Sequence, residues 1–171
     1  MWELYAMWAW VPIMLLVSYQ NAGLPEHFAK YAAFGIFVAG GAGSYIAGIW
    51  ADKIGRTTIT SIALTVSGIC CAIVGFFFNQ PILLTAICLI WGFAVVADSA
   101  QFSAAVSELA DPNYVGTALQ VQTSIGFLLT LVTLQIMPSL IEAIGYEYAY
   151  LFLIPGPIVG IISMQIGRAH V

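Results

Sequence analysis

Long apolar runs alternate with short polar segments along the chain. Six of these runs have about the 20 residues that a helix needs to cross a membrane. Glycine, proline, asparagine and aspartate collect between the runs, as is typical of turns. The pattern predicts an all-α membrane protein with six transmembrane helices. The predicted spans are residues 2–20, 28–50, 58–78, 82–108, 114–137 and 146–165.

Composition agrees with a protein that crosses the membrane several times. Hydrophobic residues make up 61% of the 171 residues and charged residues only 7%, whereas soluble proteins carry roughly 25% charged residues. The net charge of −4 comes without a basic patch or arm, so nucleic-acid binding has no support. The three cysteines lie in apolar runs without metal-ligand spacing. We therefore predict no metal site, no cofactor and no disulfide framework.

The first predicted span is rich in aromatic residues. Trp8 and Trp10 lie too deep for a simple interfacial belt, so a position facing a cavity is at least as well supported. Pro12 removes one backbone hydrogen bond and is expected to kink this helix. The Pro-Gly-Pro sequence at 155–157 is likewise expected to bend or unwind the last span.

The second predicted span carries small residues at every fourth position. Such spacing lets two helices approach closely in lipid. A tight packing seam is the better interpretation, and it names no substrate. The two stripes are Gly35, Ala39, Gly43 and Ala47, and beside them Gly40, Ser44 and Gly48.

The fourth predicted span carries a polar stripe around Asp98, which lies only about 5 Å from the midpoint of that span at 1.5 Å per residue. A carboxylate there costs about 2.5–3.5 kcal/mol, so it is expected to face a cavity or a partner. Hydrogen bonds between helices are the alternative, and cavity lining is favoured over it. One face holds Trp91, Asp98, Gln101 and Glu108, and the adjacent face holds Ser99, Ser103 and Ser107.

A short polar segment between the second and third spans has a distinctive order. Gly48 is followed by Asp52 and Lys53, and then by Gly55 and Arg56. Gly48 would allow close backbone approach, and Gly55 a tight turn. Asp52 could accept hydrogen bonds from amides at a helix start. Lys53 and Arg56 would mark the cytoplasmic side.

This segment resembles the loop signature of the major facilitator superfamily, which joins the second and third helices of a six-helix half. The resemblance covers residues 1–165 and implies one half of a twelve-helix bundle. The second half is the better match, because the fourth span lacks the arginine that many first halves carry there. Thr57 departs from the pattern, since many members have a second basic residue at this place. Residues 166–171 match one reading frame of a common sequencing adapter, so we predict a non-native tail.

The resemblance also implies roles for residues. In this family the first and fourth helices of each half line the central cavity. The signature loop gates the cytoplasmic side, and here its residues are Gly48, Asp52, Lys53, Gly55 and Arg56. Glu3 and Asp98 are predicted to face each other at one level, as candidates for proton coupling. The implied substrate and proton pathway is Glu3, Tyr5, Trp8, Trp10, Trp91, Asp98, Gln101 and Ser103.

The function that the resemblance implies is secondary transport of a small solute by alternating access, with proton coupling as an option. Its expected partners are membrane lipid, the solute and the other six-helix half, in a bacterial inner (plasma) membrane. The lone chain is not expected to transport. The alternative is a non-transporting membrane scaffold or subunit that pairs with another six-helix chain. An enzyme has no support, because no nucleophile-with-base arrangement or metal-binding motif is present.

Overall fold

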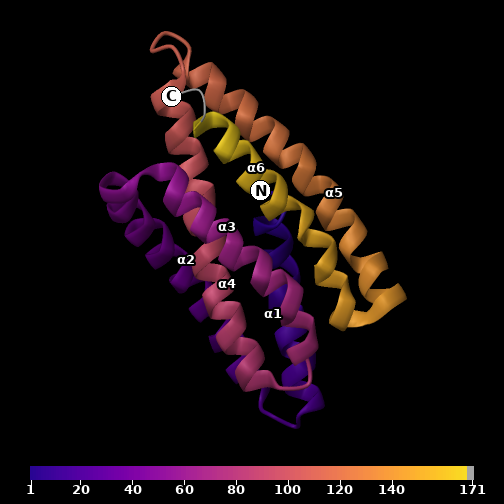
Figure 1. The fold of residues 1–171 in the computed structure, drawn as a ribbon. Helices are drawn as coiled ribbons and strands as arrows, with labels where there is room; N and C mark the ends of the chain where they lie inside the picture. The colour runs from indigo at the N-terminus through magenta and orange to yellow at the C-terminus, as the bar shows by residue number, and fades with distance from the viewer. Residues whose placement is uncertain (169–171) are drawn as a thin grey trace.

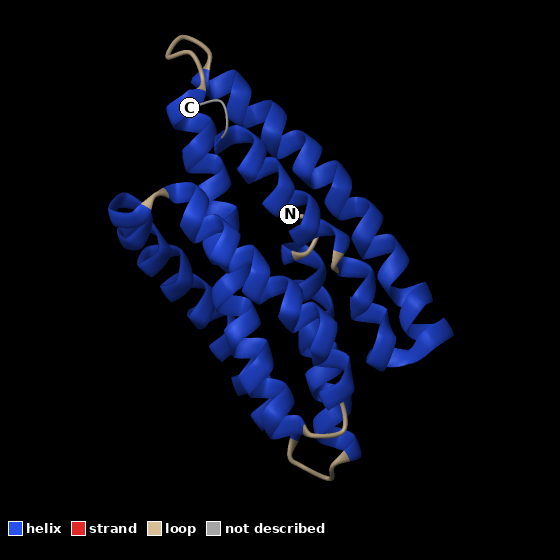
Figure 2. Ribbon diagram, in the orientation of Figure 1, coloured by secondary structure: helices blue, strands red, loops and turns tan. Residues whose placement is uncertain are grey.

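The computed structural model describes residues 1–168, and side chains up to Ile166. The described residues form helices and contain no strand (Figure 2). Part of the predicted non-native tail, 169–171, lies outside the described residues. The elements are α1 (Leu4–Asn21), α2 (Glu26–Ile54), α3 (Arg56–Ile73), η1 (Val74–Phe77), α4 (Pro81–Leu109), α5 (Val115–Ala149), η2 (Tyr150–Leu153) and α6 (Pro155–Arg168) (Figure 1).

Four helical stretches of the described chain are long and apolar enough to cross a membrane. They are Glu26–Ile54, Arg56–Phe77, Pro81–Leu109 and Val115–Ile166. An α-helical membrane protein is thus supported, but the predicted count of six spans is not confirmed. α1 is not among the four: its 18 residues rise about 27 Å, and its last turn, 18–21, is polar. α5, η2 and α6 together count as one stretch.

The non-helical segment predicted between the fifth and sixth spans, residues 138–145, is shorter than expected. α5 continues through Pro138, and the first residue outside helical geometry is Gly145, with φ 76° and ψ 171°. Proline keeps a helical φ and removes only one backbone donor, so one proline did not end the helix. A positive φ is open to glycine at little cost, and here it interrupts the helix. The chain then reverses direction, and α6 begins at Pro155 (Figure 1).

The predicted small-residue seam is confirmed where α2 crosses α4. A side chain at Gly43 would meet the backbone of Phe93, and one at Gly40 would lie 3.2 Å from the carbonyl oxygen of Gly92. From the other side, a Cβ at Gly92 would lie 2.9 Å from the carbonyl oxygen of Ile36. The two backbones therefore approach too closely for larger residues.

α1 lies inside the bundle, packs against α2, α4 and α5, and forms more of the core than any other helix of the described chain. Met7, Val11, Met14 and Leu15 of α1 are at most 1% exposed. Pro12 lies inside this helix, which continues from Leu4 to Asn21. All three cysteines are free thiols in the same interior, and they are Cys70, Cys71 and Cys88.

Candidate functional site

Glu3 occupies a polar site inside the bundle. It is 4% exposed, and one oxygen of its carboxylate accepts hydrogen bonds from the indole N–H of Trp91 and the hydroxyl of Ser67. The thiol of Cys71 lies 3.3 Å from the same oxygen. These partners come from α3 and α4, so Glu3 joins the start of α1 to both helices. Each donor supplies part of the solvation that burial removes from the carboxylate.

Asp98 forms a second buried polar site. It is 5% exposed, and the hydroxyl of Ser99 lies 3.0 Å from its Oδ1 atom. Among the described residues, no hydrogen bond joins Asp98 to Glu3. The α4 partner of Glu3 is instead Trp91, which lies seven residues from Asp98, or about 10 Å along the helix axis. The two carboxylates are therefore both buried, and each has its own hydrogen-bond partners.

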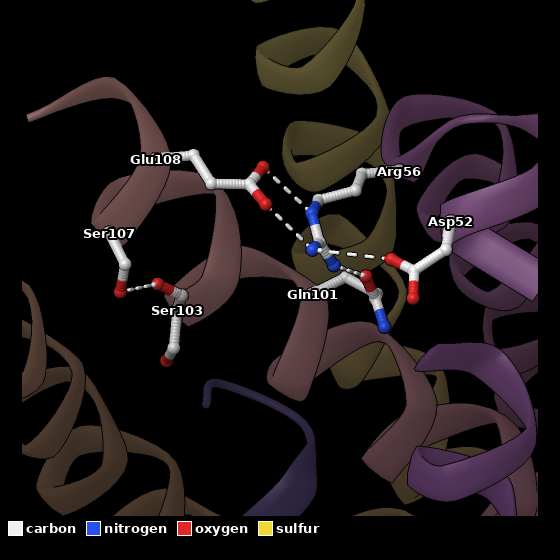
Figure 3. A network of polar contacts seen from close by, with 6 residues as sticks. All are labelled: Asp52, Arg56, Gln101, Ser103, Ser107 and Glu108. Carbon is white, nitrogen blue, oxygen red and sulfur yellow. Dashed lines mark hydrogen bonds and ion pairs between the residues drawn. The ribbon is translucent and has the colours of Figure 1, made fainter. Parts of the chain in front are cut away.

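Arg56 organises a third polar cluster where α2, α3 and α4 meet (Figure 3). Its Nε and Nη2 atoms lie 2.8 and 2.7 Å from the two carboxylate oxygens of Glu108. Its Nη1 atom donates to the side-chain oxygen of Gln101 at 2.9 Å, and its Nη2 atom lies 3.5 Å from Asp52. The bidentate contact uses the planar fork that only arginine offers. Gln101 was predicted for the substrate pathway, and here it belongs to this cluster.

The backbone at Gly55 sets the geometry of the cluster. Gly55 alone separates α2 from α3, and its φ of 93° is one that glycine adopts readily. The predicted tight turn is confirmed. The prediction for Gly48 was wrong, because it lies within α2 and a side chain there would meet nothing within 4 Å. Asp52 pairs with Arg56 rather than capping backbone amides, and Lys53 is exposed in the last turn of α2.

The aromatic residues of α1 pack against several helices. The ring of Tyr5 lies 5.6 Å from Trp8 and 5.5 Å from Phe127 on α5. Trp8 also lies 5.6 Å from Phe37 on α2. The indole nitrogens of Trp8 and Trp10 are buried without a hydrogen-bond partner in the described part of the chain. These two rings therefore contribute mainly packing surface.

Two cavities lie on either side of Phe102. The Arg56 cavity, about 750 Å³, is bounded by α3, α4 and α6 and includes Arg56 and Glu108 in its wall. The Trp2 cavity, about 480 Å³, lies between α4, α5, α6 and the first residues of the chain. Ser103, predicted for the pathway, lines the Trp2 cavity. The other polar residues that line the Trp2 cavity were not predicted for the pathway from the sequence. They are Trp2, Ser99 and Gln122.

Comparison of the chain with models of known families, with curated proteins and with solved structures finds no match. Among the described residues, no cluster of three or more histidine, cysteine, aspartate or glutamate side chains is arranged to hold a metal ion. The polar side chains of the interior are instead carboxyl, hydroxyl, amide and indole groups. The carboxyl groups can bind protons and all of these groups can form hydrogen bonds to a solute, and they are the basis for a functional proposal.

Proposed function

We propose that this chain is part of a secondary transporter, which moves a small solute across a membrane by alternating access. Within that proposal the chain is one six-helix half of a twelve-helix bundle of the major facilitator type, in a bacterial inner membrane. The observation that carries the proposal is the pair of buried carboxylates, Glu3 and Asp98, inside a bundle of membrane-spanning length. A charged group near the centre of a membrane-spanning helix, as Asp98 is in Pro81–Leu109, costs about 2.5–3.5 kcal/mol and marks solute or proton pathways.

The contacts of Glu3 support a coupling between proton binding and helix packing. The ionised carboxylate accepts hydrogen bonds from Trp91 and Ser67 and so ties α1 to α4 and α3. A proton on Glu3 removes the charge that strengthens these bonds. The contact between α1 and its neighbours then becomes weaker, and α1 is freer to move against α3 and α4. Protonation of Glu3 can in this way shift the equilibrium between the two conformations of an alternating-access transporter.

The Arg56 cluster supports a gate at one end of the helices. Its contacts join the end of α2, the start of α3 and the end of α4. Any opening that separates these ends must break the bidentate contact with Glu108. Arg56 and Glu108 are partly exposed, with 26% and 55% of their side chains accessible. Water can therefore hydrogen-bond to both groups when the contact breaks, which lowers the free-energy cost of opening. Such a contact can open and close repeatedly.

Uptake measurements test the transport proposal. The complete protein that contains this chain would be expressed in bacterial cells and supplied with a panel of radiolabelled neutral, cationic and anionic solutes. We expect uptake of at least one solute, and loss of that uptake in Asp98→Ala. The matched control is Ser107→Ala, because Ser107 is exposed and bonds only to the carbonyl of Ser103. Uptake that Asp98→Ala leaves unchanged would contradict the role of Asp98.

Proton coupling has its own test. In proteoliposomes with an imposed pH gradient, we expect the proton dependence of uptake to disappear in Asp98→Asn, which keeps the shape of the side chain and removes its titration. Uptake in Asp98→Asn that still follows the pH gradient would remove Asp98 from the coupling pathway. Glu3→Gln tests the second carboxylate in the same way.

The packing of α2 weakens the scaffold alternative. The stripe of small residues suited a surface for pairing with another chain. Gly40 and Gly43 instead lie against α4 of the same chain, so this part of the stripe is used internally. Crosslinking in native membranes would separate the two proposals. A stable partner protein without any uptake activity would favour the scaffold.

A further inference from the structure

The contact between Glu3 and α4 depends on the orientation of one side chain, Trp91. This residue is 0% exposed, and its indole N–H donates to the carboxylate of Glu3. An indole has a single N–H, which points in one direction in the plane of the ring. A change of rotamer would carry this donor away from the carboxylate. The Glu3 site therefore needs a neighbour that holds the indole in place.

The ring of Tyr150 lies directly against this indole. The two ring centroids are 5.7 Å apart and the ring planes are inclined by 85°, which is the edge-to-face arrangement that aromatic rings prefer. Tyr150 is only 1% exposed. Its hydroxyl has no hydrogen-bond partner in the described part of the chain. Tyr150 therefore acts on its neighbours through its ring.

The backbone just before Tyr150 has a firm support. A side chain at Gly75 of η1 would meet the backbone of Glu147, so the two segments are in direct backbone contact. Tyr146 stacks on Phe78, with ring centroids 5.0 Å apart and ring planes inclined by only 13°. Such close packing leaves little room for movement. The ring of Tyr150 thus reaches Trp91 from a part of the chain that η1 holds in place.

We propose that Tyr150 is a positioning residue for the Glu3 site: its ring holds the indole of Trp91 in the orientation that donates to Glu3. The contact extends the Glu3 site from α1, α3 and α4 to the junction between α5 and α6. A shift of η2 away from α4 would free the indole and remove one donor from the carboxylate. In its effect on transport this inference rests on the proposed function, whereas the contact itself is testable without any uptake.

The distance between the Trp91 indole and the Glu3 carboxylate tests the proposal. The complete protein that contains this chain would carry ¹⁵N in its indole rings and ¹³C in its glutamate carboxyl groups. Solid-state NMR in lipid bilayers then measures the dipolar coupling between the two nuclei, which falls steeply with their separation. We expect a strong coupling that disappears in Trp91→Phe. Its absence from the unchanged protein would overturn the proposal.

Substitutions of Tyr150 separate the role of its ring from that of its hydroxyl. Tyr150→Phe keeps the ring and is expected to keep the coupling. Tyr150→Leu removes the ring and is expected to lose most of the coupling, because the indole is then free to change rotamer. Should Tyr150→Leu fail to fold, as judged by size-exclusion chromatography and circular dichroism, Tyr150→Met takes its place, since methionine fills irregular space without a ring.

Phe152→Leu is the matched control for these variants. Phe152 belongs to the same η2 turn, but its ring lies 5.3 Å from that of Trp2. We expect Phe152→Leu to keep the coupling between Trp91 and Glu3. An undiminished coupling in Tyr150→Leu would overturn the proposal. Equal losses in Tyr150→Leu and Phe152→Leu would overturn it too, because they would show a general disturbance of η2.

Uptake measurements connect the contact to transport. Tyr150→Leu is expected to lower uptake about tenfold or more, which corresponds to one hydrogen bond to a charged group, whereas Tyr150→Phe restores it. Loss of the coupling with unchanged uptake would support the positioning role and contradict the role of Glu3 in transport. A coupling that Tyr150→Leu leaves unchanged would overturn the positioning role, even where Asp98→Ala abolishes uptake. Loss of both would support the two proposals together.

Discussion

At the scale of single residues, Glu3 has the most demanding environment. One of its oxygens accepts from Trp91, Ser67 and Cys71, all of which are buried. Removal of a buried acceptor leaves its donors unsatisfied, which costs about 1–3 kcal/mol for each group. The stability of the α1 packing therefore depends strongly on this one side chain.

Glu3→Ala is expected to destabilise the protein by about 2–4 kcal/mol, because Trp91 and Ser67 both lose their acceptor. Unfolding in mixed micelles, followed by circular dichroism, measures the change. Glu3→Gln keeps an acceptor oxygen and is expected to lose less than half as much. Equal stability of Glu3→Ala and the unchanged protein would show that the Glu3 contacts add nothing to folding.

Two glycines of the signature segment are expected to respond in opposite directions to alanine. Gly55→Ala forces a side chain into a φ of 93° and is expected to cost about 1–3 kcal/mol. Gly48→Ala lies in a helix with open space around it and is expected to stabilise by about 0.4–1 kcal/mol. Thermal unfolding of the pair tests this difference. A lower midpoint for Gly48→Ala than for Gly55→Ala would reverse the assignment.

At the scale of helices, the sequence predicted contacts better than it predicted ends. The four-residue spacing of small residues in two neighbouring stripes, one with Gly40 and one with Gly43, identified a close packing face, since small residues have little other use in an apolar helix. The helix ends depended on single backbone torsions. Gly55 and Gly145 adopt positive φ whereas Pro138 continues its helix, and composition does not reveal which of these residues interrupts a helix.

Gly43→Ala tests the α2–α4 contact. The added methyl group would meet the backbone of Phe93, which cannot move aside as a flexible side chain can. We expect a loss of about 1–3 kcal/mol, the usual cost of overpacking. Gly41→Ala on the same helix is the matched control, because its Cβ would meet nothing within 4 Å. A loss of similar size in both variants would point to helix flexibility instead of the contact.

At the scale of the whole molecule, three polar clusters lie at different places in the bundle. The Glu3 site, Asp98 and the Arg56 cluster were all visible in the sequence as isolated polar residues, but their partners were not. Gln101 shares a face of α4 with Asp98, yet it bonds to Arg56. Helical spacing identifies which residues share a face, whereas the packing of neighbouring helices decides which contacts they make.

The Arg56 cluster is expected to affect transport more than stability. Arg56→Lys keeps the charge and loses the bidentate contact with Glu108. We expect uptake to fall about tenfold or more while the unfolding midpoint changes little, because the pair is partly exposed. Lys30→Gln, which removes an exposed charge from α2 outside the gating loop, is expected to preserve uptake. Full uptake in Arg56→Lys would contradict the gate.

The interior position of all three thiols makes the chain a convenient background for chemical labelling. Cys70, Cys71 and Cys88 are at most 4% exposed, so a bulky, membrane-impermeant maleimide is expected to leave the unmodified chain unlabelled. A single Lys53→Cys substitution would then carry the only reactive sulfur. Labelling of that variant in intact cells, compared with inverted vesicles, would report which side of the membrane the junction at Gly55 faces.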